Sequence, residues 1–240
     1  KRASAKKIVV VMPYYGYARQ DRLVDRSCVS AKVVANFLQA SRIDALVTID
    51  LHSSQITGFF DIPIDDLKAA NLFADYFKKK NIKDAVVVSP DAGGVVRARK
   101  LAELLNVPFA IIYKHRPFPN AVGETRLIGD VKGKTAIMID DMVDTCGSLV
   151  KASQALLDGG AKKVFACATH AVLSGAALDN LSKSSLQEIV FTNTIAHKAL
   201  PKKFVFLSIA PLLAETIKRI DKEKSVSELF EQWPIGLNNF

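Results

Sequence analysis

The sequence has little of what marks a secreted, zinc-binding or membrane-spanning protein. It contains three cysteines, Cys28, Cys146 and Cys167, an odd number at wide spacings. Neither a disulfide framework nor a zinc ribbon fits such a set, so a reducing, cytoplasmic compartment is expected. No apolar run reaches the roughly 18 residues that a membrane-spanning helix needs. The first residues also lack the apolar-then-small pattern of a signal peptide, so no membrane partner is expected.

Motifs for binding nucleic acid are missing too, although the net charge is +9. The chain has no zinc finger, no arginine-rich arm and no strand studded with aromatic residues. One dense cationic run, residues 78–80, ends a helical pattern, where cations interact favourably with the helix dipole. We therefore expect no nucleic-acid partner. Phosphorylated small molecules remain an open explanation for the positive charge.

What the chain does have is an alternation of apolar strands and amphipathic helices. Its 240 residues, 49% of them hydrophobic, can bury the core of one or two domains. Strands are predicted over 8–13, 45–50, 85–89, 109–113, 135–139, 163–169, 188–193 and 204–208. Helices are predicted over 30–40, 69–79, 95–105, 149–158, 177–181 and 211–220. This order is typical of α/β proteins with mostly parallel sheets covered by helices.

A joint between two such units is indicated by the stretch GFFDIPIDDLKAANLF, where proline and acidic residues interrupt the pattern. We therefore expect a first domain over 1–67 and a second over 68–220. A further helix at about 221–233 is expected to pack back on the first domain. Each half has a strand that ends in aspartate with a polar loop behind it, which suggests two related halves.

Three carboxylates, Asp140, Asp141 and Asp144, follow the predicted strand over 135–139 in the stretch TAIMIDDMVDTCGS. A helix cap uses at most one of them, and carboxylates this close repel one another. A cationic or polyhydroxylated ligand is therefore expected, beyond the carboxyl ends of the strands where open parallel sheets bind ligands. The alternative is a cap formed by Asp144 with two solvated acids beside it.

The next residues, up to the predicted helix, suit a phosphate group, because backbone N–H groups point outward at a helix N-terminus. The acid pair can accept hydrogen bonds from sugar hydroxyls, directly or through a magnesium ion. The stretch resembles the phosphoribosyl-pyrophosphate loop shared by phosphoribosyltransferases and ribose-phosphate pyrophosphokinases. The resemblance implies that ribose 5-phosphate is bound by Asp140, Asp141, Asp144, Thr145, Cys146, Gly147 and Ser148.

A second loop separates these two families. The stretch DLHSSQITGFFDIPID, residues 50–65, resembles the signature of ribose-phosphate pyrophosphokinases, which salvage phosphoribosyltransferases do not carry. Asp50 and His52 offer a hard oxygen and an imidazole to a divalent ion or to nucleotide phosphates. A lone histidine after a strand is more often structural. The resemblance implies instead that His52 binds ATP and that both residues bind Mg2+.

Two more loops follow strands. In VVVSPDAGGVVRARK, Asp91 stands before a glycine pair, and we expect it to bind Mg2+, which prefers one or two carboxylates plus substrate oxygens. In IIYKHRPFPNAVGETRLIGD, Lys114 and Arg116 open a long loop of the kind that often forms a lid. Cations there suit a transition state that spreads negative charge over phosphate oxygens. A merely solvated basic loop is the alternative; the resemblance implies catalytic roles for both.

The resemblance to ribose-phosphate pyrophosphokinases covers nearly the whole sequence. In YYGYARQDR it implies that Arg19 and Gln20 bind ATP, and arginine suits phosphate as a bidentate donor. It further implies two phosphoribosyltransferase-like domains and a homo-oligomer, with dimers assembled into hexamers. Compared with the family, the sequence lacks a preceding segment whose hairpin holds adenine, so the N-terminal domain is expected to be incomplete.

The implied activity is transfer of a diphosphoryl group from Mg-ATP to ribose 5-phosphate, which yields phosphoribosyl pyrophosphate and AMP. Two alternatives remain open. A phosphoribosyltransferase would consume that product, but residues 50–65 and the Lys114–Arg116 pair argue against it. A non-catalytic, synthetase-associated regulatory subunit or fragment would carry degraded catalytic loops, whereas the loops here are mostly whole.

Overall fold

The computed structural model describes residues 1–115, 124–197 and 201–231, without the side chains of residues 114, 115, 124, 125 and 231. The chain divides into two compact units. The first unit combines residues 1–69 with the C-terminal stretch from Ile209, and the second unit spans residues 70–208. None of the helices in the described part of the chain is both long and apolar enough to cross a membrane.

The first unit is built on a small parallel sheet with the strand order β1-β2-β3. The strands are β1 (Val9–Val11), β2 (Ala45–Ile49) and β3 (Ile64–Leu67). The helices are α1 (Ser30–Ala40), the 3-10 helix η1 (Ser54–Phe59), α6 (Ala210–Asp221) and α7 (Glu228–Glu231). The central strand β2 is buried along its whole length, as expected for an apolar strand between two parallel neighbours.

The second unit contains a seven-stranded sheet with the order β10-β9-β8-β7-β4-β5-β6. Its strands are β4 (Ala85–Ser89), β5 (Phe109–His115), β6 (Glu124–Ile128), β7 (Thr135–Val143), β8 (Lys163–Ala171), β9 (Glu188–Thr192) and β10 (Phe204–Leu207). Its helices are α2 (Ala70–Lys79), α3 (Val95–Leu105), α4 (Gly147–Asp158) and α5 (Ala177–Lys183). All neighbours pair in parallel except β5 and β6, which are antiparallel. The predicted α/β class is therefore confirmed.

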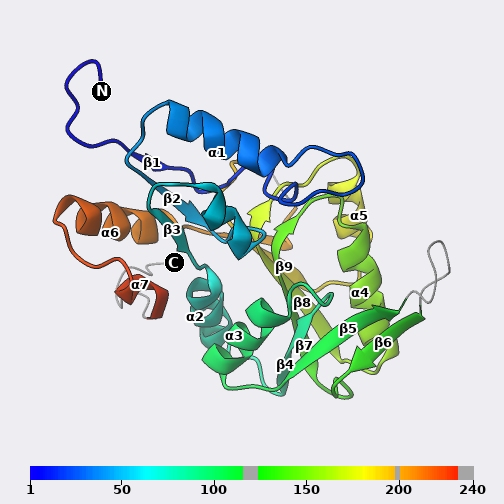
Figure 1. The fold of residues 1–240 in the computed structure, drawn as a ribbon. Helices are drawn as coiled ribbons and strands as arrows, with labels where there is room; N and C mark the ends of the chain where they lie inside the picture. The colour runs from blue at the N-terminus through cyan, green and yellow to red at the C-terminus, as the bar shows by residue number, and fades with distance from the viewer. Residues whose placement is uncertain (116–123, 198–200, 232–240) are drawn as a thin grey trace. The chain divides into compact units, whose positions relative to one another are not determined.

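Helices cover both faces of this sheet, with α2 and α3 on one face and α4 and α5 on the other (Figure 1). Side chains alternate accordingly along β7: Met138 packs with Leu149 and Leu156 of α4 in one buried cluster. On the other face, the ring of Phe77 in α2 meets that of Phe165 in β8 edge to face, with centroids 6.3 Å apart. Burial on both faces explains why these strands read as continuous apolar runs.

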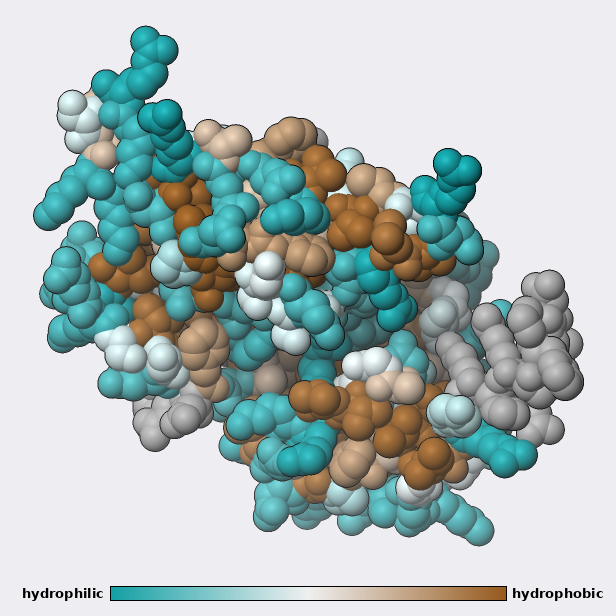
Figure 2. Space-filling view, in the orientation of Figure 1, coloured by the Kyte–Doolittle hydropathy of each residue, from teal (hydrophilic) through white to brown (hydrophobic). Residues whose placement is uncertain are grey.

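The outer edge of this sheet keeps hydrophobic side chains exposed. Phe109 and Tyr113 of β5, Ile128 of β6 and Val96 at the start of α3 all lie on the surface. In the space-filling view, hydrophobic side chains gather over α3 and β5 (Figure 2). The helices of the second unit therefore cover the middle of the sheet more fully than the β5–β6 edge.

The structure differs from the sequence prediction in several places. Strands β3 and β6 were not expected, and β7 runs to Val143, beyond the predicted end at residue 139. The helix expected at about 221–233 is α7 alone within the described residues, since α6 ends at Asp221. The helix at 210–221, expected in the second domain, groups with the first unit. The assignment of these units as two related domains stays a prediction.

Candidate functional site

The acid pair of the sequence lies inside β7 and not in a loop after it. Asp140 pairs with Ala168 of β8, and the ladder continues to Met142 and His170. The backbone N–H of Asp141 donates to Oδ1 of Asp140 at 2.9 Å. The side chain of Asp141 is only 5% exposed and that of Asp140 is 30% exposed. The expectation that the strand ends before the carboxylates was therefore wrong, and the sheet itself holds them in place.

Arg97 of α3 forms an ion pair with each member of this acid pair. Its Nη1 lies 3.5 Å from Oδ1 of Asp140 and 3.5 Å from Oδ1 of Asp141. We did not predict a role for Arg97, although the sequence held a signal for it. Arg97 stands four residues before Leu101, which is fully buried, so a cation lies on the sheet-facing stripe of an amphipathic helix.

The environment of Asp140 favours its protonated form. Burial raises the pKa of Asp140 above its ordinary value, and the hydrogen bond and negative charge of Asp141 raise it further. The Arg97 guanidinium opposes this shift without cancelling it. When both carboxylates are ionised, they share one cation and carry a surplus of negative charge, which hydroxyl donors of a ligand could offset. The site is thus prepared for a ligand rich in O–H groups.

The loop after β7 leads directly into α4. Cys146 occupies the N-cap position with a left-handed φ of 69°, and its carbonyl accepts the first helical bond, from the Val150 N–H at 3.0 Å. The side chain of Cys146 makes no capping hydrogen bond to this helix. Asp144 accepts a hydrogen bond from the hydroxyl of Ser174, and the alternative of an Asp144 cap stays a prediction. The N-terminus of a twelve-residue helix is a suitable anion site.

The thiol of Cys146 is buried, so this residue offers a ligand its backbone and not its side chain. Burial raises the pKa of its thiol to about 12, with a further contribution from the charge of Asp144. Cys167 is also buried, and its Sγ donates to the Met138 carbonyl at 3.4 Å, whereas Cys28 is exposed. The thiolate is the reactive form of cysteine, so neither buried thiol should react readily near neutral pH.

Titration of the folded chain with a thiol reagent at pH 8 should therefore show one fast thiol and two slow ones. The Cys28→Ser variant should lose the fast phase, and denaturant should expose all remaining thiols. A fast phase that survives in this variant would contradict the assigned burial.

The loop after β4 is arranged around Asp91. Its Oδ1 accepts the backbone N–H of Gly94 at 3.0 Å, and its carbonyl accepts the Ser89 hydroxyl at 2.6 Å. A Cβ added to Gly94 would stand 2.9 Å from the Ser89 hydroxyl oxygen, so this turn requires glycine. The side chain of Asp91 is presented at an exposed position at the carboxyl end of β4.

The presentation of Asp91 at the end of β4 fits Mg2+. Among the described residues, no group of three or more histidine, cysteine, aspartate or glutamate side chains could hold a metal ion. Mg2+ does not need such a cage, because it binds one or two carboxylates and completes its shell with water and substrate phosphates. A single exposed carboxylate such as Asp91 is sufficient on the protein side.

In the first unit, Asp50 is engaged by its own neighbours. It follows β2 with a left-handed φ of 44°, and the residue is buried, with 6% of its surface exposed. Oδ2 accepts the Ala69 N–H at 3.0 Å, and the Lys68 ammonium lies 3.9 Å from Oδ1. This geometry favours a structural role for Asp50. Its proposed contact with a metal stays a prediction.

The other residues predicted to bind ATP are exposed in the first unit. His52 lies between β2 and η1, and Arg19 and Gln20 lie on the segment before α1. The Ala31 N–H donates to the carbonyl of Gln20 at 3.1 Å, which ties this segment to the first turn of α1. The roles of His52, Arg19 and Gln20 in binding ATP stay predictions.

The structure brings the residues predicted to bind ribose 5-phosphate together. Of the predicted catalytic pair, it describes only the backbone of Lys114. Asp140, Asp141 and the loop 144–148 form one continuous segment at the carboxyl end of β7. The backbone of Lys114 lies in β5, opposite Thr125 of β6. Arg116 lies outside the described residues. Roles for Lys114 and Arg116 therefore stay predictions.

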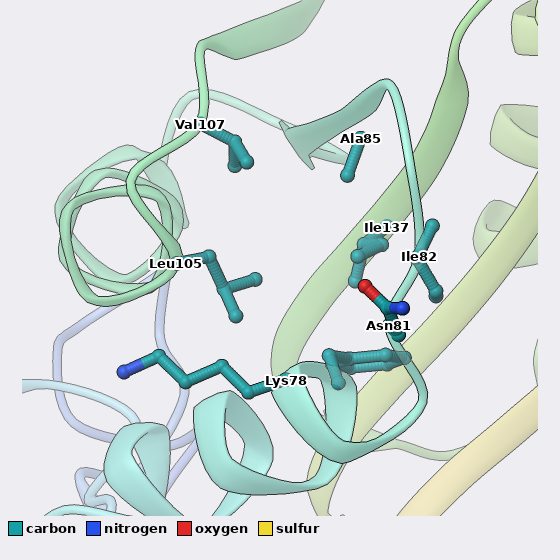
Figure 3. A pocket seen from close by; sticks show the side chains of 8 residues that line it. Lys78, Asn81, Ile82, Ala85, Leu105, Val107 and Ile137 are labelled. Carbon is teal, nitrogen blue, oxygen red and sulfur yellow. The ribbon is translucent and has the colours of Figure 1, made fainter.

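A pocket of about 220 Å³ lies at the other end of the same sheet (Figure 3). It is lined by Phe77, Lys78, Asn81, Ile82, Ala85, Leu105, Val107 and Ile137. Ala85 is the first residue of β4, and Leu105 is the last of α3. The pocket therefore opens at the amino ends of the strands, away from the acid pair, and we assign it no part in the site.

A mostly parallel sheet with an acid pair near the carboxyl end of one strand, and a helix that follows this strand after a short loop, is typical of α/β proteins of the phosphoribosyltransferase-like class. Comparisons with known proteins narrow this class. The model for the N-terminal domain of ribose phosphate pyrophosphokinase matches residues 1–41, and the model for a phosphoribosyl synthetase-associated domain matches residues 115–231.

Curated relatives are close. A ribose-phosphate pyrophosphokinase of Bacillus caldolyticus is 53% identical over 234 residues, which cover 96% of this chain and 74% of the relative. That of Bacillus subtilis is 50% identical over 233 residues. The crystal structure of phosphoribosylpyrophosphate synthetase from Mycobacterium smegmatis aligns with a TM-score of 0.85 at 42% identity, over 92% of this chain and 74% of that one. The chain belongs to the ribose-phosphate pyrophosphokinase family.

Proposed function

We propose that this chain transfers the β,γ-diphosphoryl group of ATP to the 1-hydroxyl of ribose 5-phosphate, forming phosphoribosyl pyrophosphate and AMP. The observation that carries the proposal is the acid pair Asp140–Asp141, held by Arg97 next to the start of α4. It supports a ligand with hydroxyls at one end and a phosphate at the other. Family membership supplies the reaction.

The ribose 5-phosphate would lie along the carboxyl end of β7. Asp140 and Asp141 would accept hydrogen bonds from the ribose hydroxyls. The backbone N–H groups at the start of α4 and the hydroxyls of Thr145 and Ser148 would donate to the 5-phosphate. Cys146 would contribute its backbone, because its thiol is buried.

In the reaction, the oxygen of the 1-hydroxyl forms a bond to the β-phosphorus of ATP while the bond from that phosphorus to the α,β-bridging oxygen breaks. The proton of the hydroxyl is released, and AMP leaves with the bridging oxygen. Little covalent chemistry is needed from the protein, so positioning and charge stabilisation dominate. Lys114 and Arg116 would stabilise the negative charge that develops on the transferred group.

Asp91 would hold Mg2+. In the first unit, His52 would contact nucleotide phosphates and is also a candidate metal ligand. The ion supplies neutralisation of phosphate charge when it is bound. Arg19 and Gln20 would bind ATP, with Arg19 as a donor to phosphate oxygens. We also propose a homo-oligomer, which light scattering on the purified chain would test.

An assay for AMP formation with ATP, Mg2+ and ribose 5-phosphate tests the proposal directly. AMP that appears only when ribose 5-phosphate is present, with no purine or pyrimidine base added, would support a diphosphokinase over a phosphoribosyltransferase. The match to a synthetase-associated domain over 115–231 supports a second candidate, a non-catalytic partner subunit. Binding of ribose 5-phosphate without AMP formation would favour that candidate.

Changes in the phosphate loop should act on sugar-phosphate affinity. In Ser148→Ala or Asp144→Ala, we expect the dissociation constant for ribose 5-phosphate to rise about 3- to 30-fold, the cost of one lost neutral or charge-assisted hydrogen bond. Calorimetry would measure this effect. The Ser182→Ala variant, in which a surface residue of α5 changes, should bind like the unaltered chain. Unchanged affinity in both loop variants would contradict the assigned phosphate site.

A further inference from the structure

Two side chains from the segment after β8 hold the phosphate loop. The Ser174 hydroxyl donates to the carboxylate of Asp144. The side-chain amide of Asn180, in α5, donates to the carbonyl of Thr145 at 3.1 Å. These contacts join positions 30 and 35 residues apart in the sequence. The loop that follows β7 is thus supported from a separate part of the chain.

The Asn180 contact acts on one peptide group. The peptide bond between Thr145 and Cys146 is trans, since the described chain has no cis peptide bond, so its C=O and N–H point in opposite directions. With the carbonyl held by Asn180, the N–H of Cys146 is directed away from α5. The next torsion, φ of Cys146, is 69°, a conformation that a residue other than glycine keeps only when its surroundings hold it.

This fixed peptide sets the direction of the helix start. Cys146 is the N-cap of α4, and its own side chain makes no hydrogen bond to the first N–H groups of that helix. A rotation of the Thr145–Cys146 peptide would move the N–H of Cys146 and change the approach to Gly147. The donors at this end can serve a phosphate only if the peptide keeps its orientation.

We propose that Asn180 is a positioning residue for the 5-phosphate of ribose 5-phosphate, acting through the Thr145 carbonyl and without touching the substrate. This inference rests on the proposed function of the loop. It adds a residue of α5 to the machinery that selects a phosphorylated over an unphosphorylated sugar, with Ser174 as a second brace on Asp144.

The Asn180→Ala variant tests the inference. The dissociation constant for ribose 5-phosphate, measured by calorimetry on the full chain, should rise about 3- to 10-fold, the effect of one hydrogen bond. In the AMP-formation assay, KM for ribose 5-phosphate should rise similarly, while KM for ATP and kcat at saturating sugar stay within about twofold. Asn180→Gln, which keeps the amide donor, should recover part of the affinity.

The matched control is Ser182→Ala, an exposed position of the same helix that does not share a helix face with Asn180. It should leave all these constants unchanged. Thermal unfolding of each variant checks that the fold is kept, and Ser174→Ala provides a second test of the brace if Asn180→Ala does not fold.

Equal affinity of Asn180→Ala and the unaltered chain would overturn the inference. So would a loss of affinity that is the same for ATP and for ribose 5-phosphate, because a general structural role would then explain it. Failure of the unaltered chain to bind ribose 5-phosphate would overturn the proposed function itself, and this inference with it.

Discussion

The Lys114→Ala variant should form AMP at least about 10³-fold more slowly than the unaltered chain and still bind ribose 5-phosphate normally. Cations that contact a transferring phosphoryl group contribute effects of this size, because they act on charge that develops only in the transition state. The sugar site at the end of β7 depends on Asp140, Asp141 and the start of α4, none of which is altered by this change. Initial rates and calorimetry would measure the two effects separately.

Lys163→Ala is the matched control. Lys163 is exposed and is also part of a strand, but it begins β8 at the amino end of the sheet, far along the strands from the sugar loop. Its removal should leave both rate and affinity unchanged. A large loss of sugar binding in Lys114→Ala would contradict the catalytic role proposed for Lys114, and a normal rate would do so as well.

Long apolar and amphipathic stretches made most of the fold predictable. The helices Ser30–Ala40 and Val95–Leu105 and the strand Ala85–Ser89 have the bounds that periodicity indicates. The strand β3 was missed because IDDL carries two aspartates, which are rare in strands. Tertiary contacts outweigh that propensity: β3 pairs with β2, and Asp66 accepts the Leu51 N–H at 3.0 Å and pairs with Lys68.

The sequence predicted the parts of the candidate site that are continuous in the chain, but not the contacts between residues far apart in the sequence. The run Asp140–Ser148 was recognised because acids, hydroxyls and glycine follow one strand. The extension of β7 was not, since it depends on pairing with Ala168 and His170 of β8. The same holds for Arg97 and Asn180, whose contacts with the loop join distant parts of the sequence. A local sequence pattern identifies candidate site residues, whereas the folded structure shows which of these residues contact one another.

The raised pKa of Asp140 means that the acid pair costs stability in the absence of ligand. In the window between about pH 4, near the ordinary carboxyl pKa, and the raised pKa of Asp140, the folded protein binds more protons than the unfolded chain. The free energy of unfolding therefore falls as the pH rises through this window. Above this window, both carboxylates are ionised in the folded protein at a cost in stability, and a ligand with hydroxyl donors can form hydrogen bonds to them.

Asp140→Asn should consequently be more stable than the unaltered chain above this window, by on the order of 1 kcal/mol, and the difference should vanish below about pH 4. The amide keeps an oxygen that can accept the Asp141 N–H, and Arg97 keeps Asp141 as its partner. Denaturant unfolding without ligand or metal, as a function of pH, would measure this. Lower stability of Asp140→Asn at neutral pH would contradict the assigned shift.

The same variant should lose affinity for ribose 5-phosphate by about 10- to 100-fold, because hydrogen bonds to a charged acceptor contribute more than those to an amide. Asp130→Asn separates this effect from a general loss of charge. Asp130 is an exposed aspartate whose pKa is lowered by the hydrogen bond from Lys134, so its removal should slightly destabilise the fold and leave sugar binding intact. Opposite effects of the two variants on stability, with a binding defect in Asp140→Asn alone, would show that the acid pair is retained for its ligand at the expense of the fold.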